Sequence, residues 1–226
     1  DAVRPLEPAL RQGLLVLGLS LSDEQVGQLL DYLALIEKWT RVYNLTAVRE
    51  PAAMLTHHVL DSLAVVQPLR AQLDRQHPDW RTAPAAHALR MLDVGSGAGL
   101  PGVVVAICCP ELRVDCVDTV AKKAAFIQQV AASLRLERLR GLHARVESLP
   151  AHYVIIASRA FASLKDFVTW SQGALLDGGI WMAMKGLYPN DEVTAVPAVT
   201  EVFHVERLSV PGLDAARCLV WLRRRT

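Results

Sequence analysis

The chain has no long hydrophobic run, although hydrophobic residues make up 52% of its 226 positions. Its longest uninterrupted apolar stretch, residues 103–109, ends at Pro110 and is far shorter than the ~20 residues that a membrane-spanning helix needs. No stretch near the start has the pattern of a signal peptide. The sequence therefore predicts a protein without a membrane segment.

Cysteine pairs and a strong net charge are also missing. The four cysteines form neither a CxxC motif nor a disulfide spacing, which is typical of the reducing cytoplasm. A net charge of +1 gives no overall sign of a nucleic-acid partner, which only a local patch would reveal. Two arginine clusters, within residues 135–140 and 223–225, are interpreted as solvated surface. We expect a cytoplasmic monomer.

Hydrophobic spacing divides the chain into three segments. Residues 1–70 are predicted to be helical, with a capping box at Ser22–Gln25 before apolar residues at helical spacing. Residues 71–88 contain two prolines and are predicted to be a linker or a surface insertion. In residues 89–226, short apolar strands alternate with helices and a hairpin closes the chain. This alternation predicts an α/β fold with a mainly parallel, doubly wound sheet.

A glycine-rich loop, Asp93–Gly102 (DVGSGAGLPG), follows the first predicted strand and precedes a helix. Counted from Gly97 it matches the GxGxxG turn of dinucleotide-binding proteins. Counted from Asp93 it matches the acidic GxGxG turn of S-adenosylmethionine (SAM) methyltransferases, with glycines at 95, 97 and 99. Asp118, at the end of the second strand, would bond ribose hydroxyls in either ligand, so it does not separate the two.

The charge of Asp93 distinguishes a dinucleotide from SAM. A carboxylate ~4 Å from a pyrophosphate would cost about 4 kcal/mol at an effective dielectric constant of ~20, whereas the sulfonium and ammonium groups of SAM are cations. Pro101 points the same way, because it donates no N–H where a phosphate would bind. The residues therefore favour SAM, and an NAD(P)-binding oxidoreductase, a non-catalytic nucleotide-binding module and a packing loop remain as alternatives.

Further motifs carry a family resemblance. Together with the loop, Ser158–Leu164 (SRAFASL), Met184–Gly186 (MKG) and residues 38–63 resemble the RsmG (GidB) family, bacterial methyltransferases that form 7-methylguanosine in 16S rRNA. The resemblance implies a Rossmann-like SAM-dependent methyltransferase fold: a mainly parallel seven-stranded sheet with a terminal antiparallel hairpin, preceded by an N-terminal helical segment. It implies SAM as cofactor and 16S rRNA of the small ribosomal subunit as partner. A SAM methyltransferase for another RNA, a protein or a small molecule is the alternative.

The glycine loop and the resemblance together give the expected cofactor-binding set. Asp93, Gly97 and Gly99 come from the loop itself, and the resemblance implies Gly95, Leu100, Asp118, Val146, Glu147 and Arg159. Arg159 and Lys185 are expected to position the substrate at the catalytic centre, gripping phosphates or the guanine O6 edge. Two departures from the family pattern are visible: no aspartate follows Tyr153 before Arg159, and residues 147–158 form a shorter stretch than usual.

The chemistry needs no general base, because guanine N7 has a lone pair and no proton. No metal site is expected, since the adjacent residues His57 and His58 would point about 100° apart on a helix. His58 remains a candidate substrate contact, and residues 43–46 either frame the cofactor site or cap a helix. The tryptophans on regular elements, Trp39, Trp170 and Trp181, are expected in the core rather than as base-stacking platforms.

Overall fold

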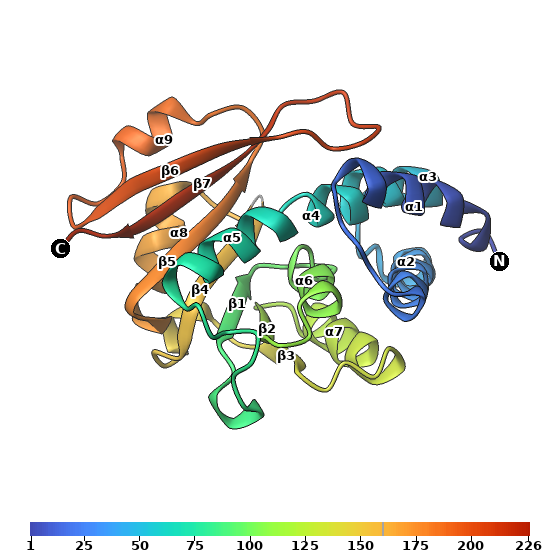
Figure 1. The fold of residues 1–226 in the computed structure, drawn as a ribbon, viewed down its shortest axis with the longest axis horizontal. Coiled ribbons are helices and arrows are strands. Elements are labelled where there is room, and N and C mark those ends of the chain that lie inside the picture. Colours follow the sequence, from blue (N-terminus) through green and yellow to red (C-terminus); the bar gives the residue numbers. More distant parts are fainter. Residues whose placement is uncertain (160) are drawn as a thin grey trace.

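The computed structural model describes residues 1–159 and 161–226. Ala160, within the Ser158–Leu164 motif, lies outside the described residues. The N-terminal helices gather at one end of the molecule and the β6–β7 hairpin at the other (Figure 1). The helices are η1 Arg4–Leu6, α1 Glu7–Val16, α2 Asp23–Tyr43, α3 Pro51–Met54, η2 Leu55–Leu60, α4 Asp61–Leu63, α5 Val66–Gln76, η3 Ala85–His87, α6 Gly102–Cys108, α7 Ala121–Ser133, η4 Val146–Ser148, α8 Leu164–Ser171, η5 Gln172–Ala174 and α9 Asn190–Thr194.

Seven strands form one sheet in the order β3-β2-β1-β4-β5-β7-β6. All neighbouring pairs are parallel except those made by β7, which runs antiparallel to both β5 and β6. This confirms the predicted mainly parallel sheet with a terminal antiparallel hairpin. The strands are β1 Arg90–Val94, β2 Arg113–Asp118, β3 Leu139–His143, β4 Tyr153–Arg159, β5 Leu175–Lys185, β6 Thr200–Leu208 and β7 Arg217–Arg224.

Two hydrophobic cores cover the two faces of the sheet. Side chains of a strand alternate between faces, so Met91 packs into the core under the N-terminal helices, α6 and α7, while Leu92 packs into the core under α8. The first core is continuous from α1 to β7, because buried residues of α2 such as Leu29 pack in the same cluster as Val104 of α6. The helical segment is thus part of the core of the α/β domain and not an appended arm.

The N-terminal segment differs from its prediction in two places. Within the segment predicted to be helical, α3 and α4 are separated by η2, a turn of π-helix. The irregular segment predicted from residue 71 is wrong for residues 71–76, because α5 continues to Gln76 and buries Leu73. Trp80 is buried as well and donates from Nε1 to Asp74 at 2.7 Å, so the segment packs against the domain. Within the described residues, no helix has both the length and the apolar character needed to cross a membrane.

Candidate active site

The glycine loop after β1 turns sharply at the carboxyl edge of the sheet. Its glycines have positive φ angles, 63° at Gly95, 56° at Gly97 and 91° at Gly99, which side chains rarely adopt. A Cβ on Gly97 would meet nothing within 4 Å, so backbone faces open space there. A Cβ on Gly99 would collide with Val103 and Ile127, so that glycine serves packing. Gly99 is buried, and its predicted contact with the cofactor stays a prediction.

Asp93 lies beneath this loop and not at its mouth. Its side chain is fully buried, and Oδ2 accepts a hydrogen bond from the backbone N–H of Gly102 at 2.7 Å. Burial raises the pKa of Asp93 to about 7, against the opposing effect of the Gly102 hydrogen bond. The predicted contact between Asp93 and a cationic ligand is therefore wrong: the carboxyl group fixes the start of α6 from below.

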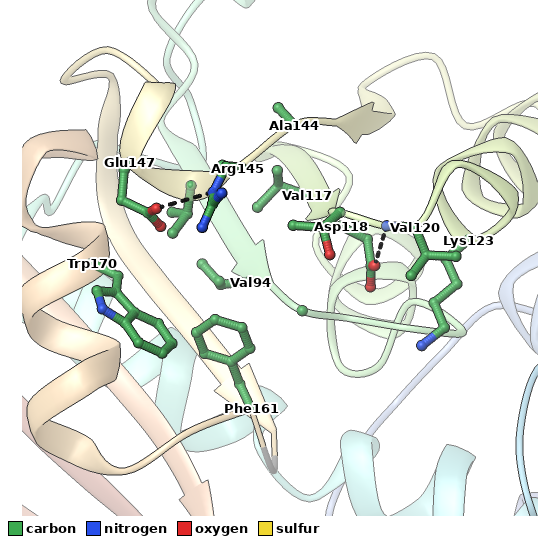
Figure 2. Close-up of a pocket in the computed structure, with 13 residues that line it drawn as sticks. Val94, Val117, Asp118, Val120, Lys123, Ala144, Arg145, Glu147, Phe161 and Trp170 are labelled. Atoms are coloured by element: carbon green, nitrogen blue, oxygen red, sulfur yellow. Dashed lines mark hydrogen bonds and ion pairs between the residues drawn. The ribbon is translucent and has the colours of Figure 1, made fainter.

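A cavity of about 460 Å³ opens at the ends of β1, β2 and β3. Asp118, the last residue of β2, lines it and is held rigidly, because Oδ2 accepts from Gly97 N–H at 3.2 Å and Oδ1 accepts from Val120 N–H at 2.9 Å. Lys123 reaches in from α7 on the same side (Figure 2). The lining residues are Val94, Gly95, Val117, Asp118, Thr119, Val120, Lys123, Ala144, Arg145, Val146, Glu147, Phe161 and Trp170.

Two aromatic rings close the other side of this first cavity. Phe161 and Trp170 meet edge to face with centroids 5.8 Å apart, and both point toward Val94 (Figure 2). Trp170 is 42% exposed, so its predicted place in the core is wrong, whereas Trp181 is fully buried and Trp39 is partly buried against the core. The pattern of the short helix α8 does not reveal which of its faces is open, so no signal in the sequence pointed to Trp170.

A second cavity of about 420 Å³ shares Gly95 with the first and extends over β4, β5 and β7. Its floor is the glycine loop, and its rim comes from the N-terminal helices and the strand ends. The lining residues are Leu45, Thr46, His58, Asp61, Gly95, Ser96, Gly97, Ala98, Leu100, Arg159, Met184, Lys185, Gly186 and Arg217. In the 43–46 segment, Asn44 caps α2 in the left-handed region, and Leu45 and Thr46 line the second cavity.

Arg159 and Arg217 share one buried carboxylate in the second cavity. Arg159 Nη1 donates to Asp61 Oδ2 at 3.3 Å and to the carbonyl of His57 at 2.9 Å. Arg217 Nε donates to Asp61 Oδ1 at 3.0 Å. Asp61 is only 2% exposed, and a carboxylate at that depth requires such partners. Neither Asp61 nor Arg217 was predicted as a site residue, because the three partners are far apart in the sequence.

His58 orients Arg159 from the opposite side. Arg159 Nη2 lies 3.2 Å from His58 Nδ1, and Thr46 Oγ1 lies 2.8 Å from Nε2. A guanidinium can only donate, so Nδ1 is the acceptor and Nε2 carries the proton. Burial, and then the charge of Arg159, lower the pKa of His58 to about 4. The imidazole is thus neutral at physiological pH, and its place on η2 fits the frequent occurrence of π-helical turns at functional sites.

Lys185 ends β5 beside this cluster. Its Nζ donates to the carbonyl of Ala162 and to Glu192 Oε1, both at 2.9 Å. Glu192 Oε1 also accepts from the backbone N–H of Leu164. The lysine therefore fixes the segment that leads from β4 to α8 and carries Phe161, and an ammonium has a third N–H for a ligand.

The structure brings most of the predicted site residues together. Asp118, Val146 and Glu147 line the first cavity, and Gly97, Leu100, Arg159 and Lys185 line the second, with Gly95 at their junction. Asp93 and Gly99 line neither cavity. Among the described residues, no group of three or more histidine, cysteine, aspartate or glutamate side chains is arranged to hold a metal ion.

The sequence profile of the GidB family, described as "rRNA small subunit methyltransferase G", matches residues 25–220. Two similar curated relatives are both named "Ribosomal RNA small subunit methyltransferase G". The relative from Albidiferax ferrireducens is 65% identical over 225 residues, covering 98% of this chain and 99% of its own length. The relative from Paracidovorax citrulli is 60% identical over 224 residues, covering 99% and 92%.

Solved structures agree on the fold. TrmN from Thermus thermophilus aligns with 76% of this chain and 53% of its own, with a TM-score of 0.51 and 19% identity. A predicted O-methyltransferase from Agrobacterium tumefaciens aligns with 61% of this chain and 74% of its own, with a TM-score of 0.50 and 21% identity. At these identities the likeness concerns the Rossmann-like methyltransferase architecture alone, which both share with the sheet described above.

Proposed function

We propose that this chain, which belongs to the GidB family, transfers a methyl group from SAM to N7 of a guanine in the 16S rRNA of the small ribosomal subunit. The observation that carries the proposal is the pair of joined cavities at the carboxyl edge of the sheet, one beside Asp118 and the other beside Arg159. Open α/β sheets bind ligands at this edge, where the strand order reverses.

The loop amides distinguish SAM from a dinucleotide. In a dinucleotide site the N–H groups of the glycine loop and the helix start face a pyrophosphate. Here Gly97 N–H donates to Asp118 and Gly102 N–H donates to Asp93, so carboxylates already occupy these donors. A pyrophosphate at this loop would lose those donors and face the charge of Asp118. The loop therefore fits a ligand without phosphate, and this argument stands without the electrostatic role first expected of Asp93.

The residues of the first cavity fit the adenosine part of SAM. Asp118 offers carboxylate oxygens that are already oriented by two backbone amides, which suits ribose hydroxyls. Val94 and Val146 line the cavity with apolar side chains that suit the base, and Glu147 lines it as well. The methionine part would then extend past Gly95 toward Arg159. When bound, SAM supplies a methyl group carried on a positively charged sulfur.

The second cavity suits an acceptor that needs no deprotonation. Guanine N7 carries a free lone pair, so the protein has only to align it with the methyl group. The acid–base groups of the cavity are engaged elsewhere: Asp61 is held by two arginines, and His58 accepts from Arg159. Catalysis then rests on positioning, which can contribute ~7–11 kcal/mol. Lys185 and Arg159 line this cavity and would donate to guanine O6, the acceptor next to N7.

Transfer of labelled methyl from SAM to small ribosomal subunits tests the proposal. Subunits from cells that lack this modification should accept label, and subunits that already carry it should not. Cleavage selective for 7-methylguanosine should then place the label at one guanine. An intact protein that binds SAM but labels neither the subunits nor their naked rRNA would overturn the proposal.

A further inference from the structure

The second cavity has more positive charge than its own carboxylate balances. Arg159 and Arg217 line it with two cations and Asp61 provides one carboxylate, whereas the third cation, Lys185, is paired with Glu192. Asp61 is shared between the two arginines, so the pair keeps a surplus positive charge. The side chains of both arginines are mostly buried, with exposures of 23% and 27%. Burying a cation at this depth costs free energy unless a counter-charge lies nearby. We therefore expect an anion to bind in this cavity.

Arg217 keeps most of its hydrogen-bonding capacity for such an anion. A guanidinium has five N–H donors. One, on Nε, goes to Asp61 Oδ1, and one, on Nη1, goes to the carbonyl of Ala216. The remaining three donors make no hydrogen bond to any of the residues 1–159 and 161–226. Asp61 holds Nε, so both Nη2 donors and one Nη1 donor of this fixed fork are available to a ligand in the cavity that Arg217 lines.

The sheet order places Arg217 at the far end of the joined cavities from Asp118. Asp118 ends β2 and Arg217 begins β7, and β1, β4 and β5 lie between them. Four inter-strand spacings of about 4.8 Å separate them by roughly 19 Å along the sheet edge. If Asp118 holds the ribose of SAM, Arg159 on β4 lies nearer to SAM than Arg217 does. Arg217 lies beyond it, next to Lys185, whose pairing partner on β7 is Cys218.

We infer that Arg217, oriented by Asp61, binds a backbone phosphate of the RNA next to the target guanosine. This inference rests on the proposed function and adds a phosphate subsite to it. A guanidinium matches phosphate oxygens with two parallel N–H donors, and a phosphate so held fixes the register of the chain relative to the base. The subsite would therefore orient the guanine while Arg159 and Lys185 approach its edge.

The arginine clusters seen in the sequence do not compete for this role. Arg140 pairs bidentately with Asp115, and Arg223 pairs with Glu201 at 2.8 Å. Arg223 lies at the other end of β7, where its pairing partner on β5 is Ile180, and thus at the opposite edge of the sheet from the cavities. Arg223 is a matched control for Arg217, because the two lie near opposite ends of the same strand and both donate from Nε to one carboxylate.

The test compares Arg217→Gln with Arg223→Gln in methyl transfer to unmodified small subunits at constant Mg²⁺. For Arg217→Gln we expect KM for the subunits to rise about tenfold. The slope of log kcat/KM against log KCl should become shallower by about 0.7 to 0.9, the loss of one phosphate contact. The Kd for SAM should not change. Arg217→Lys should keep the wild-type slope but raise KM, because it keeps the charge and loses the fork. Arg223→Gln should match the wild type throughout.

Two results would overturn the inference. A weaker Kd for SAM with an unchanged KM for subunits would show that the anion is the methionine carboxylate. Identical behaviour of Arg217→Gln and Arg223→Gln would remove any role for Arg217. If Arg217→Gln does not fold, Arg217→Lys decides the question, because a KM at the wild-type value would contradict the need for a fork. A wild-type protein that methylates no RNA would instead refute the proposed function, which separates the two failures.

Discussion

Arg159 donates to Nδ1 of His58 at 3.2 Å, and this contact links the end of β4 to the π-helical turn η2. The two residues are far apart in the sequence, yet the contact sets both the orientation of the guanidinium and the tautomer of the imidazole. Thr46 completes the arrangement by accepting from Nε2. His58 is thus a positioning residue for Arg159, and its proton is not needed for the chemistry.

His58→Asn should retain more activity than His58→Leu. An asparagine oxygen lies near the position of Nδ1 and can accept from Arg159, whereas leucine offers no acceptor. We expect kcat/KM to fall only a few-fold for asparagine and by about tenfold or more for leucine, the usual weight of a hydrogen bond to a charged group. Activity of both variants measured against pH should keep the wild-type profile between about pH 6 and 8, because His58 is already neutral there. A pH profile that changes with His58→Asn would assign it a proton-transfer role.

Arg159→Ala should fold and lose most of its methyl transfer. Asp61 keeps Arg217 as its partner in this variant, so its carboxylate is not left without a counter-charge. Loss of a charged hydrogen-bond donor is worth about 1.5–3 kcal/mol, which corresponds to a fall in kcat/KM of roughly 10- to 150-fold. Circular dichroism checks that the variant is folded, and labelled methyl transfer on the same preparation checks that its activity is lost. Normal turnover would reduce Arg159 to a structural ion pair.

Asp118→Ala should weaken SAM binding. The variant loses two bonds from backbone amides and the carboxylate that faces the first cavity, so we expect the Kd from titration calorimetry to rise at least tenfold. Asp177→Asn, an exposed carboxylate on β5, serves as control and should bind as the wild type does. Equal affinity for SAM in Asp118→Ala and the wild type would exclude the ribose contact.

Asp93 should make the folded protein less stable as pH rises toward neutrality. Burial raises its pKa to about 7, and an unfolded aspartate titrates near 3.9, a value about three units lower. Between about pH 4 and 7 the unfolded chain binds fewer protons at this position than the folded protein, so this group lowers the free energy of unfolding with increasing pH. Asp93→Asn removes that term and keeps an acceptor for Gly102.

Urea denaturation of both proteins at about pH 5 and pH 7.5 measures the effect. The free energy of unfolding of Asp93→Asn relative to the wild type should be larger at the higher pH, by no more than about 4 kcal/mol. The comparison with the variant cancels His58, whose lowered pKa has the opposite effect: its contribution to stability is present above the unfolded value and declines as pH falls toward about 4. A difference that does not vary with pH would show that Asp93 is ionised throughout.

The sequence predicted what is local. The glycine loop and Asp118 follow directly from strand ends, and the parallel order of the sheet follows from alternating strands and helices. The prediction ended helix α5 too early, because the prolines at 78 and 84 suggested an irregular segment. In the structure the helix continues to Gln76, and Gln72 and Leu73 in its last turns are buried.

The second cavity could not be predicted in the same way. Asp61 lies 98 residues from Arg159 and 156 residues from Arg217. Their meeting depends on how the N-terminal helices pack on the sheet, which no local pattern records. Asp93 was misplaced for a related reason: its position before the glycines is the same whether its carboxylate points out of the loop or under it.

The π-helical turn η2 makes the length of this short stretch as important as its composition. Successive residues of a helix are about 100° apart around its axis. Deleting one residue within Leu55–Leu60 would therefore turn Asp61 away from both arginines, even if every other side chain were kept. We therefore expect natural relatives to vary in length around residues 77–84 far more readily than in this turn, where the spacing sets the direction of Asp61.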